Sequence, residues 1–150
     1  VAMKVSTADA QYIFNLCHAI KGKDFAFITG NENAFYAGLY AGAVACIGQG
    51  CTINAPIVRA IQDRFEAGDH EGAVAAQWST CLLGNESRSP VEFFKRYVTE
   101  KGYAVPVFAR VDKNNPYAEC PTPITQEQYD TYKKILETEM AKYTAAPVGV

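Results

Sequence analysis

The stretch VAMKVST, residues 1–7, is a short apolar run that carries one lysine and ends in two hydroxyl residues. Val1–Val5 is predicted to be a β-strand, and a helical pattern of apolar residues follows it. Burial of Lys4 would favour its neutral amine, which is a nucleophile towards carbonyl carbons. Alternatively, Lys4 lies on an edge strand and reaches water along its own stem.

Two further apolar runs follow the first. Phe25–Ile28 and Ala43–Ile47 are predicted strands, separated from Val1–Val5 and from each other by predicted helices over residues 8–21 and 33–40. Gly22 and Gly42 are placed to end these helices. Strands that alternate with helices through short loops are typical of parallel βαβ units, so the fold class is α/β.

The rest of the chain carries helical patterns only. Asn54 is predicted to cap a helix over 55–66, and Asp69 one that runs to Leu83 and ends at Gly84. Capping boxes at Ser89 and Thr125 predict helices to about residues 101 and 143. Residues 102–123 are predicted to be a loop, and 145–150 a frayed tail.

Composition excludes several classes of function. The 150 residues suffice for one domain, and 49% hydrophobic and 20% charged residues are ordinary for a globular protein. A net charge of -2 argues against nucleic acid as a partner. No apolar run is long enough to span a membrane. Five scattered cysteines without a C-x-x-C pair predict no metal site and a reduced cytoplasmic protein, in which Cys51 alone is expected to be exposed.

The candidate chemistry lies at the ends of the predicted strands, where active sites of parallel α/β proteins gather. Strand alternation puts Ala2, Lys4 and Ser6 on one face and Met3 and Val5 on the other. Ser6 or Thr7 then either binds a carbonyl compound beside Lys4 or caps the following helix. His18 and His70 have no telling partners and are expected to be structural or surface residues.

Glycine-containing loops follow the other two strands. In ITGNE, residues 28–32, Gly30 allows a close backbone approach, and Glu32 is either a site residue or a first-turn acid that complements the helix dipole. IGQGCT, residues 47–52, lacks the third glycine of a dinucleotide-binding motif. We therefore expect it to form a glycine-lined rim at the end of its strand.

Three motifs together resemble one family. MKVST (residues 3–7), FITGNE (27–32) and GLYAGAVACIG (38–48) occur in the order and spacing of the dihydrodipicolinate synthase / N-acetylneuraminate lyase family of class I aldolases. Residues 55–58 through 65–69 resemble that family's last barrel helix and the turn after it. The resemblance covers residues 1 to about 77, and is looser beyond.

The resemblance implies the C-terminal part of a (β/α)₈ barrel, with strands 6–8 and their helices in residues 1–67 and a helical extension in 68–150. It implies that Lys4 forms a Schiff base with pyruvate or another 2-keto acid, without metal or organic cofactor. Ser6, Gly30, Glu32, Gly48 and Gln49 would bind substrate. It also implies a cytoplasmic homotetramer.

Departures from the family's motifs limit this assignment. Val5-Ser6 stands where synthases often have Asp-Ser, and Gln49 where lyases often have serine, although the lyase branch is closer. The family's tyrosine proton relay belongs to the first half of the barrel. Because the chain starts inside a strand and without methionine, we expect a segment that needs its N-terminal half, from the same parent or another chain. The alternative is a non-catalytic, repurposed fragment that serves as a binding or structural module.

Overall fold

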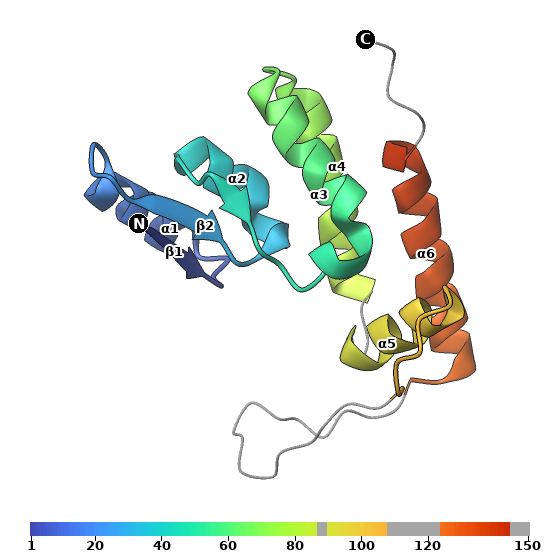
Figure 1. The fold of residues 1–150 in the computed structure, drawn as a ribbon. Helices are drawn as coiled ribbons and strands as arrows, with labels where there is room; N and C mark the ends of the chain where they lie inside the picture. Colours follow the sequence, from blue (N-terminus) through green and yellow to red (C-terminus); the bar gives the residue numbers. More distant parts are fainter. Residues whose placement is uncertain (87–89, 108–123, 145–150) are drawn as a thin grey trace.

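The computed structural model describes residues 1–86, 90–107 and 124–144. It is mostly helical and contains a small parallel sheet at one end (Figure 1). The strands are β1 (Ala2–Val5), β2 (Ala26–Thr29) and β3 (Ala45–Cys46), in the order β1-β2-β3. The predicted α/β class and the parallel βαβ order are confirmed.

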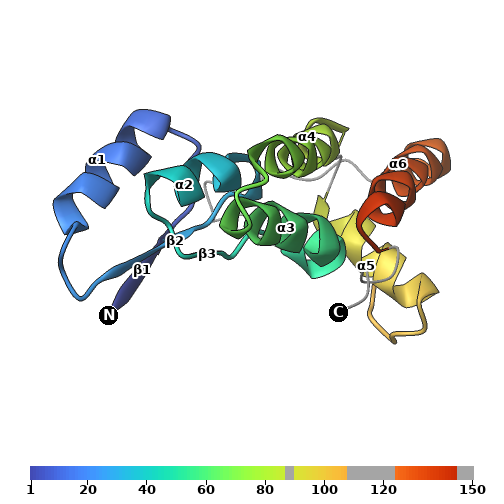
Figure 2. The same cartoon turned by 90° about the horizontal axis from the view of Figure 1, so that it is seen from above.

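The two crossover segments pack on the same face of the sheet. They contain α1 (Ala10–Ile20), and the short 3₁₀ helix η1 (Glu32–Ala34) followed by α2 (Phe35–Ala41). Figure 2 shows α1 and α2 together above the strands, with no described helix below them. Ile13 and Cys17 of α1 pack with Phe27 of β2 in a core cluster under this layer.

The other face of the sheet carries Ala2, Lys4, Ala26, Ile28 and Ala45, which share a side because Lys4 pairs with Ile28 and Ile28 with Ala45. None of these five side chains is fully buried. Parallel sheets in complete proteins are normally covered on both faces. The described residues therefore form an incomplete layer, as expected for part of a barrel.

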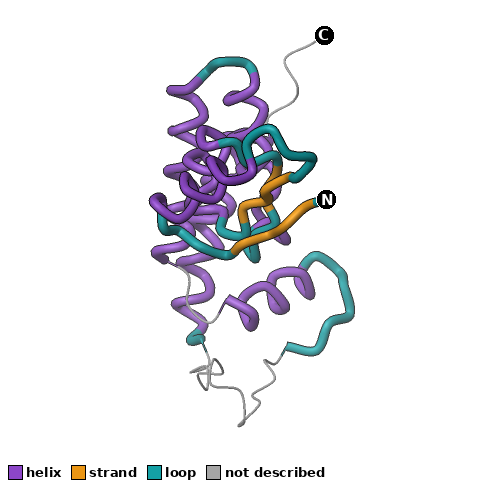
Figure 3. Tube along the Cα trace, turned by 90° about the vertical axis from the view of Figure 1, so that its left-hand side faces the viewer, coloured by secondary structure: helices purple, strands orange, loops and turns teal. Residues whose placement is uncertain are grey.

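The remaining helices are α3 (Cys51–Glu66), α4 (His70–Glu86), α5 (Pro90–Glu100) and α6 (Gln126–Thr144). Seen from the side of the sheet, they stand behind the strands (Figure 3). Their core contains Ile57, Leu83, Tyr129 and Leu136, each at most 2% exposed. This helical region closes its own apolar core.

Two predicted helix boundaries need correction. The helix predicted from residue 55 is preceded by a further turn that begins at Cys51, and Asn54 forms the kink between the two parts, with φ/ψ of -113° and 22° and no cap bond from its Oδ1. The helix expected to stop at Gly84 continues to Glu86. A Cβ at position 84 would overlap the Asn33 side chain, so this glycine serves close packing and not helix termination.

Local capping signals were better guides. Asp69 Oδ1 accepts the backbone N–H of Gly72 at 2.9 Å at the start of α4. At α6, Thr125 and Gln128 exchange side-chain to backbone hydrogen bonds of 2.9 and 3.1 Å, which confirms that capping box. The capping box at Ser89, most of the 102–123 loop and the tail at 145–150 fall outside the described residues.

Candidate active site

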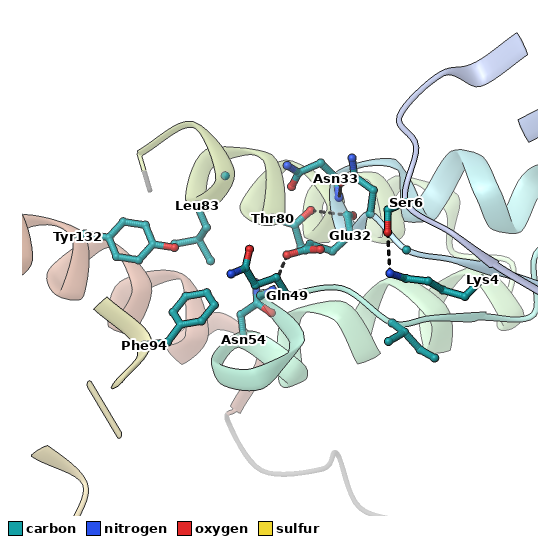
Figure 4. Close-up of a pocket in the computed structure, with 15 residues that line it drawn as sticks. Lys4, Ser6, Glu32, Asn33, Gln49, Asn54, Thr80, Leu83, Phe94 and Tyr132 are labelled. Carbon is teal, nitrogen blue, oxygen red and sulfur yellow. Dashed lines mark hydrogen bonds between the residues drawn. The ribbon is translucent and has the colours of Figure 1, made fainter. Parts of the chain in front are cut away.

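The carboxyl ends of the three strands border a cavity of about 520 Å³. Its lining contains five of the residues expected from the sequence and several more from the helical region (Figure 4). The expected ones are Lys4, Ser6, Gly30, Glu32 and Gln49; the others include Asn33, Asn54, Thr80, Phe94 and Tyr132. Lys4 and Ser6 lie at one end of the cavity, and Phe94 and Tyr132 at the other.

The lysine lies on the edge strand β1, and its side chain is exposed. Of the two alternatives for Lys4, the edge-strand lysine that reaches water fits the described chain, because nothing described covers this face of the sheet. The Lys4 ammonium donates a hydrogen bond of 2.6 Å to Ser6 Oγ (Figure 4). The amine thus faces the cavity and is held at its rim by the hydroxyl two residues along.

Ser6 does not cap the next helix. Asp9 does so, since its carboxylate accepts the backbone N–H of Tyr12 at 3.1 Å. Thr7 Oγ1 accepts the backbone N–H of Asp9 at 3.0 Å and thereby shapes the turn that leads into α1. The two hydroxyls have separate positions, and only Ser6 borders the cavity.

Gly30 makes room for this pair. Its backbone N–H donates to the Val5 carbonyl at 2.8 Å, which draws the end of β2 against the end of β1. A Cβ at position 30 would overlap Lys4 Cε and Ser6 Oγ. The close approach that the sequence predicted at Gly30 is thus an approach by the protein's own lysine and serine.

Glu32 connects the second strand end to the third. Its carboxylate accepts the backbone N–H of Gly50 at 2.7 Å, and a Cβ at Gly48 or Gly50 would overlap this carboxylate. Its backbone carbonyl accepts Gln77 Nε2 of α4 at 2.9 Å. Gly48 is therefore packed against Glu32 and is not among the cavity-lining residues, unlike its neighbour Gln49.

Asn54 is a site residue that the sequence did not reveal. It is only 4% exposed, borders the cavity, and its Oδ1 has no hydrogen-bond partner. A buried acceptor without a partner costs free energy, which a ligand hydroxyl or amine would recover. In the sequence, Asn54 stands just before a helical pattern, where asparagine is a common helix cap. Its position therefore gave no reason to predict a binding role.

Two further findings concern other classes of site. Among the described residues, no group of three or more His, Cys, Asp or Glu is arranged to hold a metal ion. None of the helices in this part of the chain combines the length and apolar character needed to cross a bilayer. His70, at the start of α4, contacts the Tyr36 hydroxyl at 3.3 Å, outside the cavity.

The fold and cavity define a class: a partial α/β barrel with polar groups at its strand ends and a helical extension as a side wall. Comparison with solved structures places it among dihydrodipicolinate synthase and N-acetylneuraminate lyase folds. The sequence itself matches no family model and no curated protein.

Three structural neighbours illustrate the likeness. A protein assigned to the dihydrodipicolinate synthase family from Coccidioides immitis has a TM-score of 0.71 at 18% identity, over 98% of this chain and 48% of that one. N-acetylneuraminate lyase from Fusobacterium nucleatum, complexed with pyruvate, gives 0.70 and 17%, over 95% and 44%. A catalytic lysine mutant of Ruminococcus gnavus sialic acid aldolase gives 0.72 and 14%, over 92% and 45%.

These neighbours share the fold with this chain. The chain spans about half the length of each, with 44–48% of their residues covered. More than half of each neighbour's chain therefore has no counterpart in these 150 residues. The neighbours are about twice as long as this chain, so their ligands and reactions are properties of the longer proteins.

Proposed function

We propose that this chain is the C-terminal half of a lyase or aldolase that forms a Schiff base with pyruvate or a related 2-keto acid through Lys4. One observation carries the proposal. An amine hydrogen-bonded to a serine stands at the mouth of a cavity, at the carboxyl end of a parallel strand. The fold around it is the one shared with sialate lyases, one of which was solved with pyruvate and another as a catalytic lysine mutant.

The chemistry needs a neutral amine. The Lys4 nitrogen attacks the keto carbon, and water leaves. The resulting protonated imine accepts the electron pair of the bond between the carbons α and β to it as that bond breaks, which gives an enamine, while the hydroxyl on the β carbon loses its proton and becomes the carbonyl of the released aldehyde. In the reverse direction the same electron sink permits bond formation. Ser6 Oγ, 2.6 Å from the Lys4 nitrogen, is placed to hydrogen-bond the reacting group.

The second substrate or the polyol tail would occupy the rest of the cavity. Gln49 and the glycine rim border this part, and Glu32 fixes the rim through Gly50. The unpartnered Asn54 Oδ1 supports a ligand that brings a donor, such as a hydroxyl group. The sialate-lyase branch is our preferred assignment because such substrates are rich in hydroxyls.

Activity would require the other half of the barrel. We assign β1–β3 to the sixth, seventh and eighth strands, so that a polypeptide with five further βα units would cover the open sheet face and both of its edges. Covering this face would remove water from Lys4 and so favour its neutral form. That half would also supply the proton relay that the reaction needs.

The test is reductive trapping. The chain, assembled with a polypeptide that supplies the first five βα units, is incubated with pyruvate and borohydride and then digested with trypsin. Modification of Lys4 blocks cleavage after it, so the expected product is a labelled peptide over residues 1–21 in place of 5–21. Lys4→Arg should abolish labelling, whereas Lys23→Arg, on the loop after α1, should leave it unchanged.

Two outcomes would overturn the proposal. An assembled barrel that binds the missing half but never labels Lys4, with pyruvate or other 2-keto acids, would establish the non-catalytic module instead. Labelling that survives Lys4→Arg would assign the chemistry to another residue.

We also propose that the assembled protein is a homo-oligomer. Val74, Trp78 and Leu82 lie four residues apart along α4 and are 37%, 70% and 40% exposed, which forms an apolar stripe. Such a stripe fits a second copy of the chain. Sedimentation should give an oligomer that Trp78→Glu dissociates, and a monomer in both cases would contradict this.

A further inference from the structure

A second reactive centre lies behind the glycine rim. Cys46 ends β3 and Cys51 begins α3, so that only the four residues 47–50 separate them. Both are free thiols, and the two side chains are close enough to shift each other's pKa. Both also pack against one apolar cluster, formed by residues such as Phe35, Leu39 and Ile61.

The loop between the two cysteines is held at both ends. The Ile47 N–H donates to the Thr29 carbonyl at 2.8 Å, and the Gly50 N–H donates to Glu32. The backbone therefore fixes the end of β3 and the start of α3 on either side of this short loop, with both cysteines against the same cluster. They are partly exposed, whereas Cys17 is buried under the sheet.

We propose that Cys46 and Cys51 are a redox dithiol, which a peroxide converts into a reversible intramolecular disulfide across the glycine rim. In the first step the Cys51 thiolate attacks one peroxide oxygen, giving a sulfenic acid and, after protonation, water. The Cys46 sulfur then attacks the Cys51 sulfur, and the sulfenic oxygen leaves as a second water. Two electrons from the sulfur pair reduce the peroxide, and an external thiol restores both cysteines.

The electrostatic surroundings assign the roles of the two sulfurs. Interaction with the Cys46 side chain lowers the pKa of Cys51 to about 7, helped by the backbone N–H groups of Gly48 and Cys51 and opposed by burial and by the nearby Glu32 carboxylate. The same interaction, together with burial, raises the pKa of Cys46. Cys51 is thus the attacking thiolate and Cys46 the resolving thiol.

This inference does not depend on Lys4 or on a keto acid. It does connect to the cavity, because the disulfide would bridge the two ends of the loop that contains Gln49. Oxidation would tie the end of β3 directly to the start of α3. The rim would then be a covalent ring.

The experiment uses the full chain and hydrogen peroxide at stoichiometric concentration, followed by iodoacetamide and tryptic mass spectrometry. The peptide 24–59 contains Cys46 and Cys51 and no other cysteine, and 5–21 contains only Cys17. We expect peptide 24–59 to lose two hydrogens and to carry no alkyl groups, and dithiothreitol to reverse both changes. The Cys17 peptide should stay reduced, since burial raises the pKa of that thiol.

Single variants separate the two roles. Cys46→Ala should stop at a sulfenic acid on Cys51 that dimedone traps, and should move the midpoint of Cys51 alkylation to higher pH. In Cys51→Ala, the remaining Cys46 should react with peroxide at least about tenfold more slowly at pH 7 than Cys51 does in the wild type. The inference is overturned if disulfides form mainly between chains, if Cys17 or Cys81 oxidises as fast as Cys51, or if Cys46→Ala leaves the alkylation midpoint unchanged.

Discussion

The sheet region, residues 1–50, and the helical region formed by α3, α4 and α6 differ in how fully each buries its apolar side chains. In the helical region, apolar side chains of α3, α4 and α6 close a core in which Ile57 and Leu136 are fully buried. In the sheet region one face is covered by α1 and α2, and the other, which carries Lys4, is open. The part that holds the proposed chemistry is therefore the part that the described residues leave open on one face.

The largest expected effect tests whether the two regions unfold independently. Leu136→Ala removes a fully buried side chain from the helical core and should lower the free energy of unfolding by about 2–5 kcal/mol. Ile13→Ala makes a comparable cavity under the sheet. In amide hydrogen exchange, Ile13→Ala should expose β1 and β2 while α3, α4 and α6 keep their protection. Equal loss of protection in both regions would show one cooperative unit.

A second prediction concerns the fit of the sheet region around its lysine. Gly30→Ala adds a Cβ that would overlap Lys4 Cε and Ser6 Oγ. In the assembled protein, displacement of the amine should slow imine trapping with pyruvate by about 100-fold. Gly22→Ala is the matched control. At its φ of 77° the substitution should cost about 1–2 kcal/mol, yet it has open space and lies away from the cavity, so trapping should persist. Equal losses in both variants would remove the steric argument.

Sequence reasoning succeeded where the signal was local. The three strands follow from short apolar runs separated by helical patterns, and the contact of Lys4 with Ser6 follows from strand alternation, since both side chains leave β1 on one side. Asn54 could not be assigned to the cavity, because the other residues that line the cavity with it, such as Lys4 and Tyr132, are distant in the sequence.

The far wall of the cavity was also missed. Thr80 and Tyr132 reach it only because α4 and α6 fold back beside the strand ends, and no spacing in the sequence encodes that contact. The two alternatives for Lys4 could not be separated from the sequence for a different reason. Its exposure depends on what packs against the open face of the sheet, and nothing among the described residues does so.

A third prediction concerns the hydrogen bonds of the buried Glu139 carboxylate within the helical region. Glu139 is 7% exposed and accepts hydrogen bonds from Ser79 at 2.6 Å and from Lys142 at 2.7 Å. Burial acts to raise the pKa of this carboxyl, but the two donors outweigh it and hold the pKa below its usual range. Glu139→Gln should therefore lower the free energy of unfolding by about 1–2 kcal/mol near pH 7.

The pH dependence gives this prediction its sign. A carboxyl whose pKa is lower in the folded state stabilises the fold above its unfolded pKa of about 4.3, and this contribution is lost as the pH falls through the folded value. Urea titrations should thus show the gap between the two proteins closing below about pH 4. Glu137 lies on the same helix as Glu139, and Glu137→Gln removes an exposed 3.4 Å pair with Lys101, so it should change stability by no more than about 0.5 kcal/mol. If the difference in unfolding free energy between wild type and Glu139→Gln stays constant with pH, the ionised Glu139 carboxylate does not stabilise the fold.

The smallest effect is the most direct test of the open face. Ile47 borders the cavity and is 57% exposed, so Ile47→Ala should change the stability of the lone chain by no more than about 0.5 kcal/mol. In the assembled barrel the same side chain would be enclosed, and its loss should weaken association of the two halves by about 1 kcal/mol. Tyr12→Ala, at a 46% exposed position on α1 over the covered face, should leave association unchanged. Equal affinities for the missing half in wild type and Ile47→Ala would mean that the partner does not close over this face, and that Lys4 stays in water even in the complex.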